Sequence, residues 1–331
     1  MATAKQEEKN TLTASRQELA TLKDLEKSSD IQKLNVSHNK LINMKGIRSF
    51  FSVTWLNLSY NMLVSIRGIE HLRNLVVLNA SHNSLTSCDD IMKLTNLKAL
   101  ILNDNQLTKL PSLSMLVDLN TLILSNNLFE SIDVTSLSNL TKLSLSFNKL
   151  ATAPSTKGNS LLLELRLTGN NIAYIPQDIQ YNKRLQILDL GQNSISCVDC
   201  LKSLTNLKNL NLKGNPITEY TDKIRRWLPR LHVLDGFKLG KLMREEAVAE
   251  IKLKPEEAAA ITTKVTETRP AVNEAASDDS EMKKEAKPIL AKKRKRGRSG
   301  VVSIENVKKK RKTTKDIFNI EENNLLSCGC G

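Results

Sequence analysis

The stretch LNTLILSNN, residues 119–127, contains the pattern that decides the fold. It reads LxxLxLxxN, with Leu119, Leu122 and Leu124 before Asn127. Subtracting the positions of the asparagines that end successive copies gives spacings of 22, 22, 22, 22, 21, 22, 23 and 22. They are Asn39, Asn61, Asn83, Asn105, Asn127, Asn148, Asn170, Asn193 and Asn215. A fixed leucine-rich period predicts an α/β fold, a right-handed leucine-rich-repeat solenoid with a concave parallel β-sheet.

The middle of each pattern predicts a short strand whose successive side chains face opposite ways. In the quoted unit, Leu122 and Leu124 are expected to point into the core, whereas Thr121, Ile123 and Ser125 line the concave face. Two further apolar columns follow each asparagine, at the second and fifth positions after it. Burying one such side chain contributes roughly 1.5–3 kcal/mol, so neighbouring repeats stabilise one another.

The repeat asparagines are expected to be structural, because they stand where the chain leaves the strand and turns. A side-chain amide both donates and accepts hydrogen bonds, so it can satisfy backbone groups of the turn inside the core. Losing it leaves those groups unpaired at about 1–3 kcal/mol each.

Both ends of the repeats show signs of caps. The stretch Asn215–Gly236 breaks the pattern and predicts a short amphipathic helix from Thr221 to Leu228. At the other end, Ser15 to Glu18 forms a capping-box pattern, and leucines at helical spacing follow it, which predicts a helix over residues 16–27. Such caps cover the apolar columns and the open strand edges.

The composition divides the chain into three parts. Residues 1–30 form an N-terminal segment with the capping helix, 31–239 a domain of about nine repeats plus a C-terminal cap, and 240–331 a Lys-rich tail. The tail holds few leucines and is expected to be mostly disordered, with a candidate helix over 241–261.

The sequence shows no membrane-spanning or secretory segment. No apolar run is long enough to form a transmembrane helix. The first ten positions carry charges where a signal peptide has an apolar core. Five cysteines, an odd number, favour a reducing compartment. We therefore expect a soluble monomer with no membrane contact.

The 22-residue repeats, together with the ending LPRLHVLDG at residues 228–236, resemble a known class of leucine-rich-repeat proteins. The class is typified by the nuclear regulatory subunit of protein phosphatase 1, and the spliceosomal A-prime protein and an axonemal dynein light chain share it. The resemblance covers residues 31–239 and implies a non-enzymatic interaction scaffold. It makes a phosphatase catalytic subunit the first candidate partner. A ribonucleoprotein component and a dynein- or cytoskeleton-associated adaptor remain the alternatives.

The concave face contains the candidate partner-binding residues. Apolar and aromatic side chains on consecutive repeats predict one contact patch, because exposed patches of this kind are typical contact sites and Trp and Tyr are favoured there. The alternative is that these residues are scattered over a sheet facing water, or lie under the N-terminal segment. The candidates are Trp55, Tyr60, Val77, Ile101, Ile123, Glu164, Arg166 and Asp189. Only three of them are charged, whereas the phosphatase-binding members of the class carry many acids there.

The tail contains a strongly basic stretch. Between Lys287 and Lys315 there are 13 Lys or Arg residues and one acid, Glu305, a net charge of 13 − 1 = +12. Two clusters separated by residues 297–307 predict a bipartite nuclear localisation signal, so a nuclear import receptor is an expected partner. They are Lys292, Lys293, Arg294, Lys295, Arg296, Lys308, Lys309, Lys310, Arg311 and Lys312. The open alternatives are RNA or DNA bound through phosphates, a membrane-surface patch and a solvated run of charge. We expect the protein in the nucleus, with a cytoplasmic fraction allowed.

Nothing in the sequence predicts an active site, a cofactor or a metal centre. The four histidines show no catalytic partner set by the repeat spacing, and there is no glycine-rich phosphate loop. Cys197 and Cys200 form a lone C-x-x-C on one loop, without the second pair that a zinc site needs. The sequence therefore predicts a protein that is not an enzyme.

Overall fold

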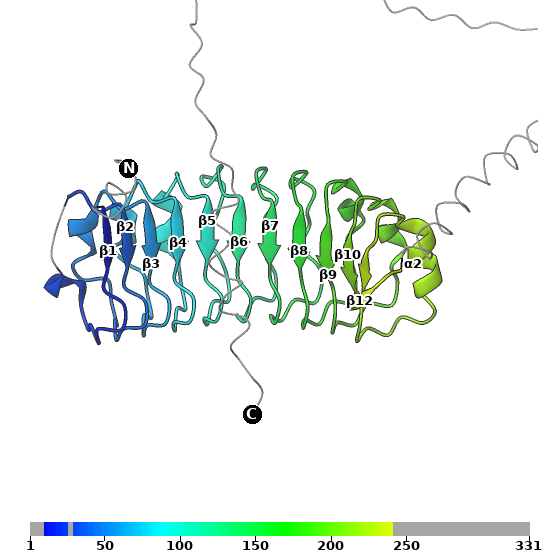
Figure 1. The fold of residues 1–331 in the computed structure, drawn as a ribbon, viewed down its shortest axis with the longest axis horizontal. Coiled ribbons are helices and arrows are strands. Elements are labelled where there is room, and N and C mark those ends of the chain that lie inside the picture. The colour runs from blue at the N-terminus through cyan, green and yellow to red at the C-terminus, as the bar shows by residue number, and fades with distance from the viewer. Residues whose placement is uncertain (1–9, 26–28, 241–331) are drawn as a thin grey trace, which may run out of the picture. The chain divides into compact units, whose positions relative to one another are not determined.

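The computed structural model describes residues 10–25 and 29–240. The chain divides into two units, Met1–Thr268 and Arg269–Gly331, and all described residues lie in the first. The candidate helix over 241–261 and both basic clusters lie outside the described residues. The described part is a solenoid whose strands lie side by side in chain order (Figure 1).

Within the described residues, the sheet has strands ordered from β1 to β12. Neighbours from β1 to β11 are parallel, and β12 runs antiparallel to its neighbour. Equivalent residues face one another, as Leu100 faces Leu122. The strands are β1 (Thr11–Thr13), β2 (Lys33–Asn35), β3 (Trp55–Asn57), β4 (Val77–Asn79), β5 (Ala99–Ile101), β6 (Thr121–Ile123), β7 (Lys142–Ser144), β8 (Glu164–Arg166), β9 (Ile187–Asp189), β10 (Asn209–Asn211), β11 (Val233–Leu234) and β12 (Phe237–Lys238). The predicted leucine-rich-repeat solenoid is confirmed.

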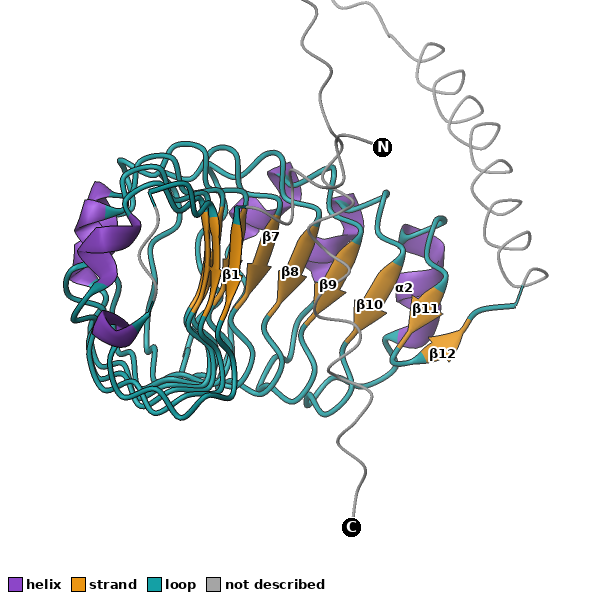
Figure 2. Ribbon diagram, turned by 60° about the vertical axis from the view of Figure 1, so that its left-hand side comes forward, coloured by secondary structure: helices purple, strands orange, loops and turns teal. Residues whose placement is uncertain are grey.

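The helices lie on the side of the coil opposite the sheet, and most are single 3₁₀ turns (Figure 2). A 22-residue period leaves about ten residues for this side, which is too few for a long α-helix. They are η1 (Leu22–Asp24), η2 (Ile47–Phe50), η3 (Ile69–His71), η4 (Asp89–Lys93), η5 (Gln177–Tyr181), η6 (Asp199–Ser203) and the α-helix α2 (Thr221–Trp227).

The core lies between the sheet and these turns. The central residue of β6, Leu122, and the residue after the strand, Leu124, are both 0% exposed. The first column after the repeat asparagines is equally buried up to Ile195. The inward direction expected for Leu122 and Leu124 is therefore confirmed.

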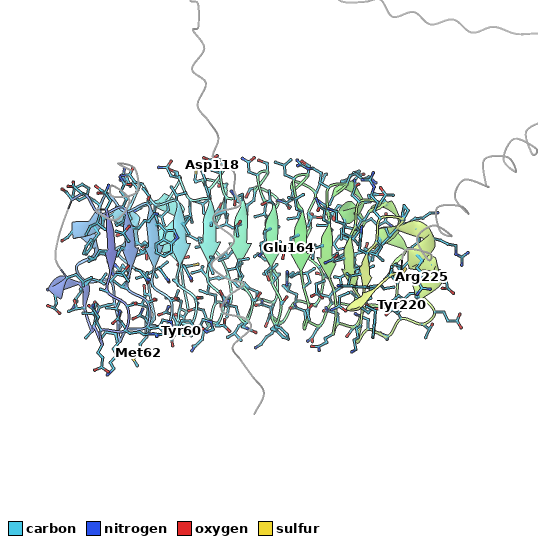
Figure 3. The ribbon with its side chains drawn as sticks, in the orientation of Figure 1. Tyr60, Met62, Asp118, Glu164, Tyr220 and Arg225 are labelled. Atoms are coloured by element: carbon cyan, nitrogen blue, oxygen red, sulfur yellow. The ribbon has the colours of Figure 1, made fainter. Side chains whose placement is uncertain are left out.

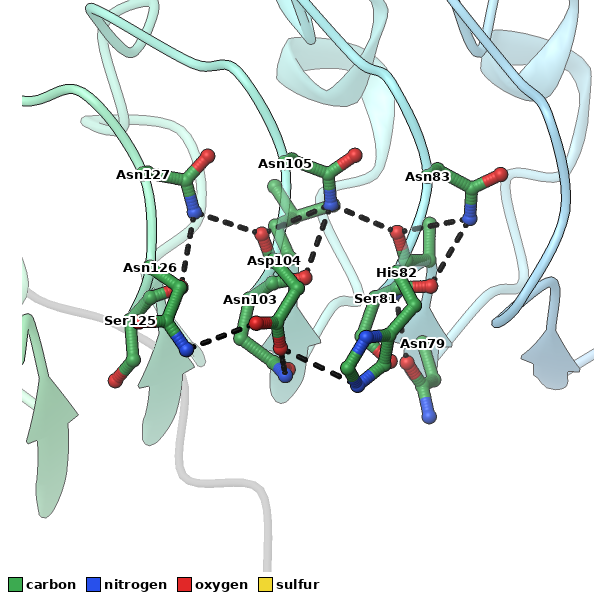
Figure 4. A network of polar contacts seen from close by, with 12 residues as sticks. Asn79, Ser81, His82, Asn83, Asn103, Asp104, Asn105, Ser125, Asn126 and Asn127 are labelled. Atoms are coloured by element: carbon green, nitrogen blue, oxygen red, sulfur yellow. Dashed lines mark hydrogen bonds and ion pairs between the residues drawn. The ribbon is translucent and has the colours of Figure 1, made fainter. Parts of the chain in front are cut away.

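The repeat asparagines join each turn to the preceding repeat. The Asn105 Oδ1 accepts from the backbone N–H of Leu85 at 3.0 Å, and its Nδ2 donates to the carbonyl oxygens of Ala80 and Leu102, each at 3.0 Å. The side chains of Asn83 and Asn127 make the same contacts one repeat away (Figure 4). Each amide thus ties together backbone segments of two repeats.

The helix expected over residues 16–27 is wrong for the described residues. Arg16 and Glu18 both have a φ of 58°, in the left-handed region that an α-helix excludes. Only the short turn η1 forms there, and its Leu22 is 0% exposed.

An additional, degenerate repeat replaces that helix. Its strand β1 pairs in parallel with β2, and Gln17 stands where Asn39 stands in the next repeat. The leucines at helical spacing occupy the apolar columns of this repeat, since Leu19 and Leu22 stand one full period before Leu41 and Met44. Stacking on the next repeat buries these side chains more completely than an isolated helix would.

The C-terminal cap contains the helix that its sequence predicts. In α2, Ile224 is 0% exposed, and the residue that follows the helix, Leu228, is 1% exposed. The Tyr220 hydroxyl donates to the Asp235 carboxylate and links the start of the helix to the last turn. This bond and burial raise the pKa of Tyr220 to about 12, with burial the larger cause.

Candidate functional site

The concave face consists of the first and third residues of each strand. Trp55 is in register with Val77, and Ile101 with Ile123, so four of the five apolar candidates lie on the adjacent strands β3 to β6. Trp55 and Ile101 are half-buried, whereas Val77 and Ile123 are only 8% and 7% exposed. The four candidates therefore form a patch of two staggered pairs, because Val77 pairs with Ala99 and Ile101 with Asn79. Trp55 is the large side chain of this patch.

Tyr60 does not belong to this patch, and its expected position on a strand is wrong. It lies in the turn after β3 with a φ of 55°, beyond the carboxyl ends of the strands (Figure 3). Its ring lies between those of His38 and His82, with centroids 4.3 and 4.1 Å away. The position before each repeat asparagine is where the backbone turns, so its side chain leaves the strand surface.

Tyr60 belongs instead to a row of side chains that we call the carboxyl-edge row: His38, Tyr60, His82, Asp104 and Asn126. His82 Nε2 lies 3.2 Å from Asp104 Oδ2, and Asn126 Nδ2 donates to Asp104 Oδ1 at 2.8 Å (Figure 4). All five have φ between 50° and 55°. Burial, with smaller contributions from Arg16 and His82, lowers the pKa of His38. The row could have been found in the sequence, since each member immediately precedes a repeat asparagine.

The charged candidates lie on the adjacent strands β8 and β9, in the C-terminal half of the concave face. The Glu164 carboxylate lies 3.8 Å from Lys142 Nζ and 2.5 Å from Arg166 Nε. Arg166 is in register with Asp189, whose carboxylate accepts from Asn211 Nδ2 at 2.9 Å. The Arg166 side chain is 47% exposed, whereas the Glu164 side chain is 16% exposed. Arg166 is therefore more accessible to a partner than Glu164.

The described cysteines differ in their exposure. Cys88 is 1% exposed, and burial, helped by Asp89 and Asp90, raises the pKa of its thiol to about 12. Cys200 is partly buried with a pKa raised to about 11, again mainly by burial, whereas Cys197 is exposed. Within residues 10–25 and 29–240, no group of three or more His, Cys, Asp or Glu side chains could hold a metal ion.

This difference predicts selective alkylation of the folded protein. Because the thiolate is the reactive form, iodoacetamide near neutral pH is expected to modify Cys197 and to leave Cys88 unmodified. Peptide mass spectrometry measures both sites, with denatured protein as the control in which both react. Equal modification of Cys88 and Cys197 in the folded protein would contradict the burial of Cys88.

No helix in the described part of the chain combines the length and the apolar character needed to cross a bilayer.

Comparison with known proteins supports the fold. Residues 160–217 match the family model for leucine-rich repeats. The acidic leucine-rich nuclear phosphoprotein 32 family member A of Drosophila melanogaster is 30% identical over 111 residues, which is 32% of this chain and 41% of that protein. The chain thus spans less than half the length of this curated relative.

Solved structures of similar fold are also found. The functional domain of InlJ from Listeria monocytogenes has a TM-score of 0.50 at 26% identity, covering 62% of this chain and 48% of that one. A complex titled TLR13–ssRNA13 has a TM-score of 0.54 at 28% identity, covering 62% of this chain and 32% of that one. The chain is a leucine-rich-repeat protein, and domains of this fold serve as interaction modules.

Proposed function

We propose that this leucine-rich-repeat protein is a non-enzymatic nuclear scaffold that holds a protein partner on its concave face. The observation that carries the proposal is the patch of two staggered apolar pairs, Trp55 with Val77 and Ile101 with Ile123, on four adjacent strands. Arg166 lies farther along the same face. Tryptophan and arginine are enriched among residues that contribute most to binding energy.

The basic tail supports the nuclear part of the proposal. Its two clusters, residues 292–296 and 308–312, have the spacing of a bipartite import signal and would bind the import receptor. The Drosophila relative is named a nuclear phosphoprotein, which agrees with this location.

Within this class we propose a regulatory subunit of protein phosphatase 1, because the repeat length and the cap resemble that class. A ribonucleoprotein component is the second candidate. The net charge of +12 over residues 287–315 favours it, since such a stretch binds phosphates of nucleic acid. The similar structure titled as a TLR13–ssRNA13 complex adds support.

The test is capture of partners from nuclear extract by the full-length protein, with and without RNase, followed by mass spectrometry. Stoichiometric recovery of a phosphatase catalytic subunit that resists RNase supports the first candidate. Recovery of ribonucleoprotein components that is lost with RNase supports the second. If the endogenous protein is excluded from the nucleus, the proposal of a nuclear scaffold fails.

Trp55→Ala is expected to weaken the captured complex by about tenfold or more while changing thermal stability little. The side chain lies on the concave face outside the core, and its truncation removes a large contact area from a partner. Binding is measured with the purified partner, and unfolding is followed by circular dichroism.

Tyr181→Ala provides the matched control, because Tyr181 is an aromatic residue that is 60% exposed on η5, away from the sheet. This variant is expected to bind as the wild type does. Equal weakening by both variants, or unchanged binding by Trp55→Ala, would contradict a partner on the concave face.

A further inference from the structure

A hollow of about 770 Å³ lies where the first three 3₁₀ helices, η1 to η3, begin. It is open to solvent rather than an enclosed cavity. Four cationic side chains line it: Lys23, Lys45, Arg48 and Arg67. The hollow lies outside the concave face and is independent of the function proposed above.

The repeat itself brings these cations together. Lys23, Lys45 and Arg67 follow one another at intervals of one full period, so they occupy the same position in three stacked repeats. Equivalent positions of neighbouring repeats lie side by side, at about the spacing of adjacent strands, roughly 4.8 Å for the backbone. Arg48 adds a fourth charge from the second of these repeats.

The backbone under the cations is held in place. The Lys45 carbonyl oxygen accepts from the Leu22 backbone N–H at 3.2 Å, so the turns bearing Lys23 and Lys45 are directly bonded. Gly46 allows this approach, since a Cβ there would lie 2.7 Å from the Leu22 carbonyl carbon and its φ is +102°. The floor of the hollow is therefore preorganised, which lowers the entropic cost of binding.

The positive charge in the hollow has no counterpart within the described residues. None of the four cations forms an ion pair there, and Glu70 is the one acidic residue among the described lining residues. Its Oε2 accepts from the Gly68 backbone N–H at 2.7 Å, and its Oε1 lies 3.4 Å from His71 Nε2. This carboxylate is thus already engaged within its own repeat. The net charge of the described lining residues is 4 − 1 = +3.

We propose that this hollow binds a small anion bearing two or more phosphate groups. Arginine binds phosphate through two parallel hydrogen bonds, and lysine adds a compact charge, so Arg48, Arg67 and the two lysines match such a ligand. Asn43 and Ser49 also line the hollow and supply neutral polar groups. A phosphate-rich anion removes the mutual repulsion of the four cations, whereas a neutral ligand leaves it in place.

Hydrogen exchange of the full-length protein tests this site separately from the basic tail, because each peptide reports its own region. The probes are inorganic pyrophosphate and inositol hexakisphosphate, with sodium sulfate at equal ionic strength as the reference. A ligand that binds the closed form slows local opening and therefore slows exchange.

We expect both phosphate probes to slow exchange in peptides covering residues 43–49 and 67–70. Sulfate is expected to slow exchange in these peptides less than either phosphate probe does. If only inositol hexakisphosphate slows exchange, the site binds anions with more than two phosphate groups. If pyrophosphate also slows exchange, the site binds simple diphosphates too.

The charge reversal Arg48→Glu with Arg67→Glu is expected to raise the probe concentration for half-maximal slowing by about tenfold or more. The control, Lys109→Glu with Lys202→Glu, changes the net charge equally at exposed positions outside the hollow and is expected to leave that concentration unchanged. Arg48→Gln with Arg67→Gln gives a milder form of the test should the reversal impair folding. No slowing in these peptides, or equal effects of the two charge reversals, overturns the proposal.

Discussion

Replacing Asn105 with leucine is expected to lower the free energy of unfolding by about 1–3 kcal/mol. The leucine side chain has a similar size but no polar atoms, so the buried backbone N–H of Leu85 is left without a partner. The carbonyl oxygens of Ala80 and Leu102 lose the Asn105 donor but keep the amides of Asn83 and Asn127. Each buried group left unpaired costs about 1–3 kcal/mol. Chemical denaturation followed by circular dichroism measures the change.

The control for this variant is Asn171→Leu. Asn171 is exposed and stands one residue after a repeat asparagine, where its own side chain makes no hydrogen bond within the described residues. A surface change of this kind is expected to stay within about 0.5 kcal/mol. If Asn105→Leu costs no more than this control, the asparagines do not hold the turns together.

Leu122→Ala is expected to cost about 2–5 kcal/mol, because it removes a buried side chain and leaves a cavity. Leu122 is 0% exposed and lies in register between Leu100 and Leu143, so it belongs to a continuous apolar column through the sheet. The thermal midpoint and the denaturant midpoint are both expected to fall.

Val117→Ala is the matched control, since Val117 is 56% exposed. Removing apolar atoms there is expected to change the unfolding free energy by less than about 0.5 kcal/mol. A neutral Leu122→Ala would mean that the strand register is wrong, and that the outward direction assigned to its neighbours is wrong with it.

Most of the fold could be predicted because the leucine positions of the repeat pattern are the positions that are buried in the structure. The alternation around Leu122 identifies which strand residues face the core, and the asparagine at a fixed place identifies the turn. The N-terminal repeat was missed because Gln17 and Ala14 replace the asparagine and the leucine of the pattern. Extending the repeat by one more period before Asn39 would have found it.

The surfaces were harder to predict than the core. Tyr60 leaves the strand surface because the backbone turns into the left-handed region one residue before Asn61, and the two-residue alternation of a strand carries no information about that turn. The hollow is lined by three cations at the repeat period and by Arg48 from another position. Only the folded turns show that these four exposed cations border the same open hollow.

The central claim is that the concave face holds the partner, and hydroxyl-radical footprinting of the captured complex tests it most directly. Trp55 is half-buried on that face, whereas Tyr181 and Met115 are each 60% exposed and lie away from the strands. The account predicts that partner binding reduces oxidation of Trp55 and leaves that of Tyr181 and Met115 unchanged. Unchanged oxidation of Trp55 together with protection of Tyr181 or Met115 would place the partner elsewhere and contradict the account.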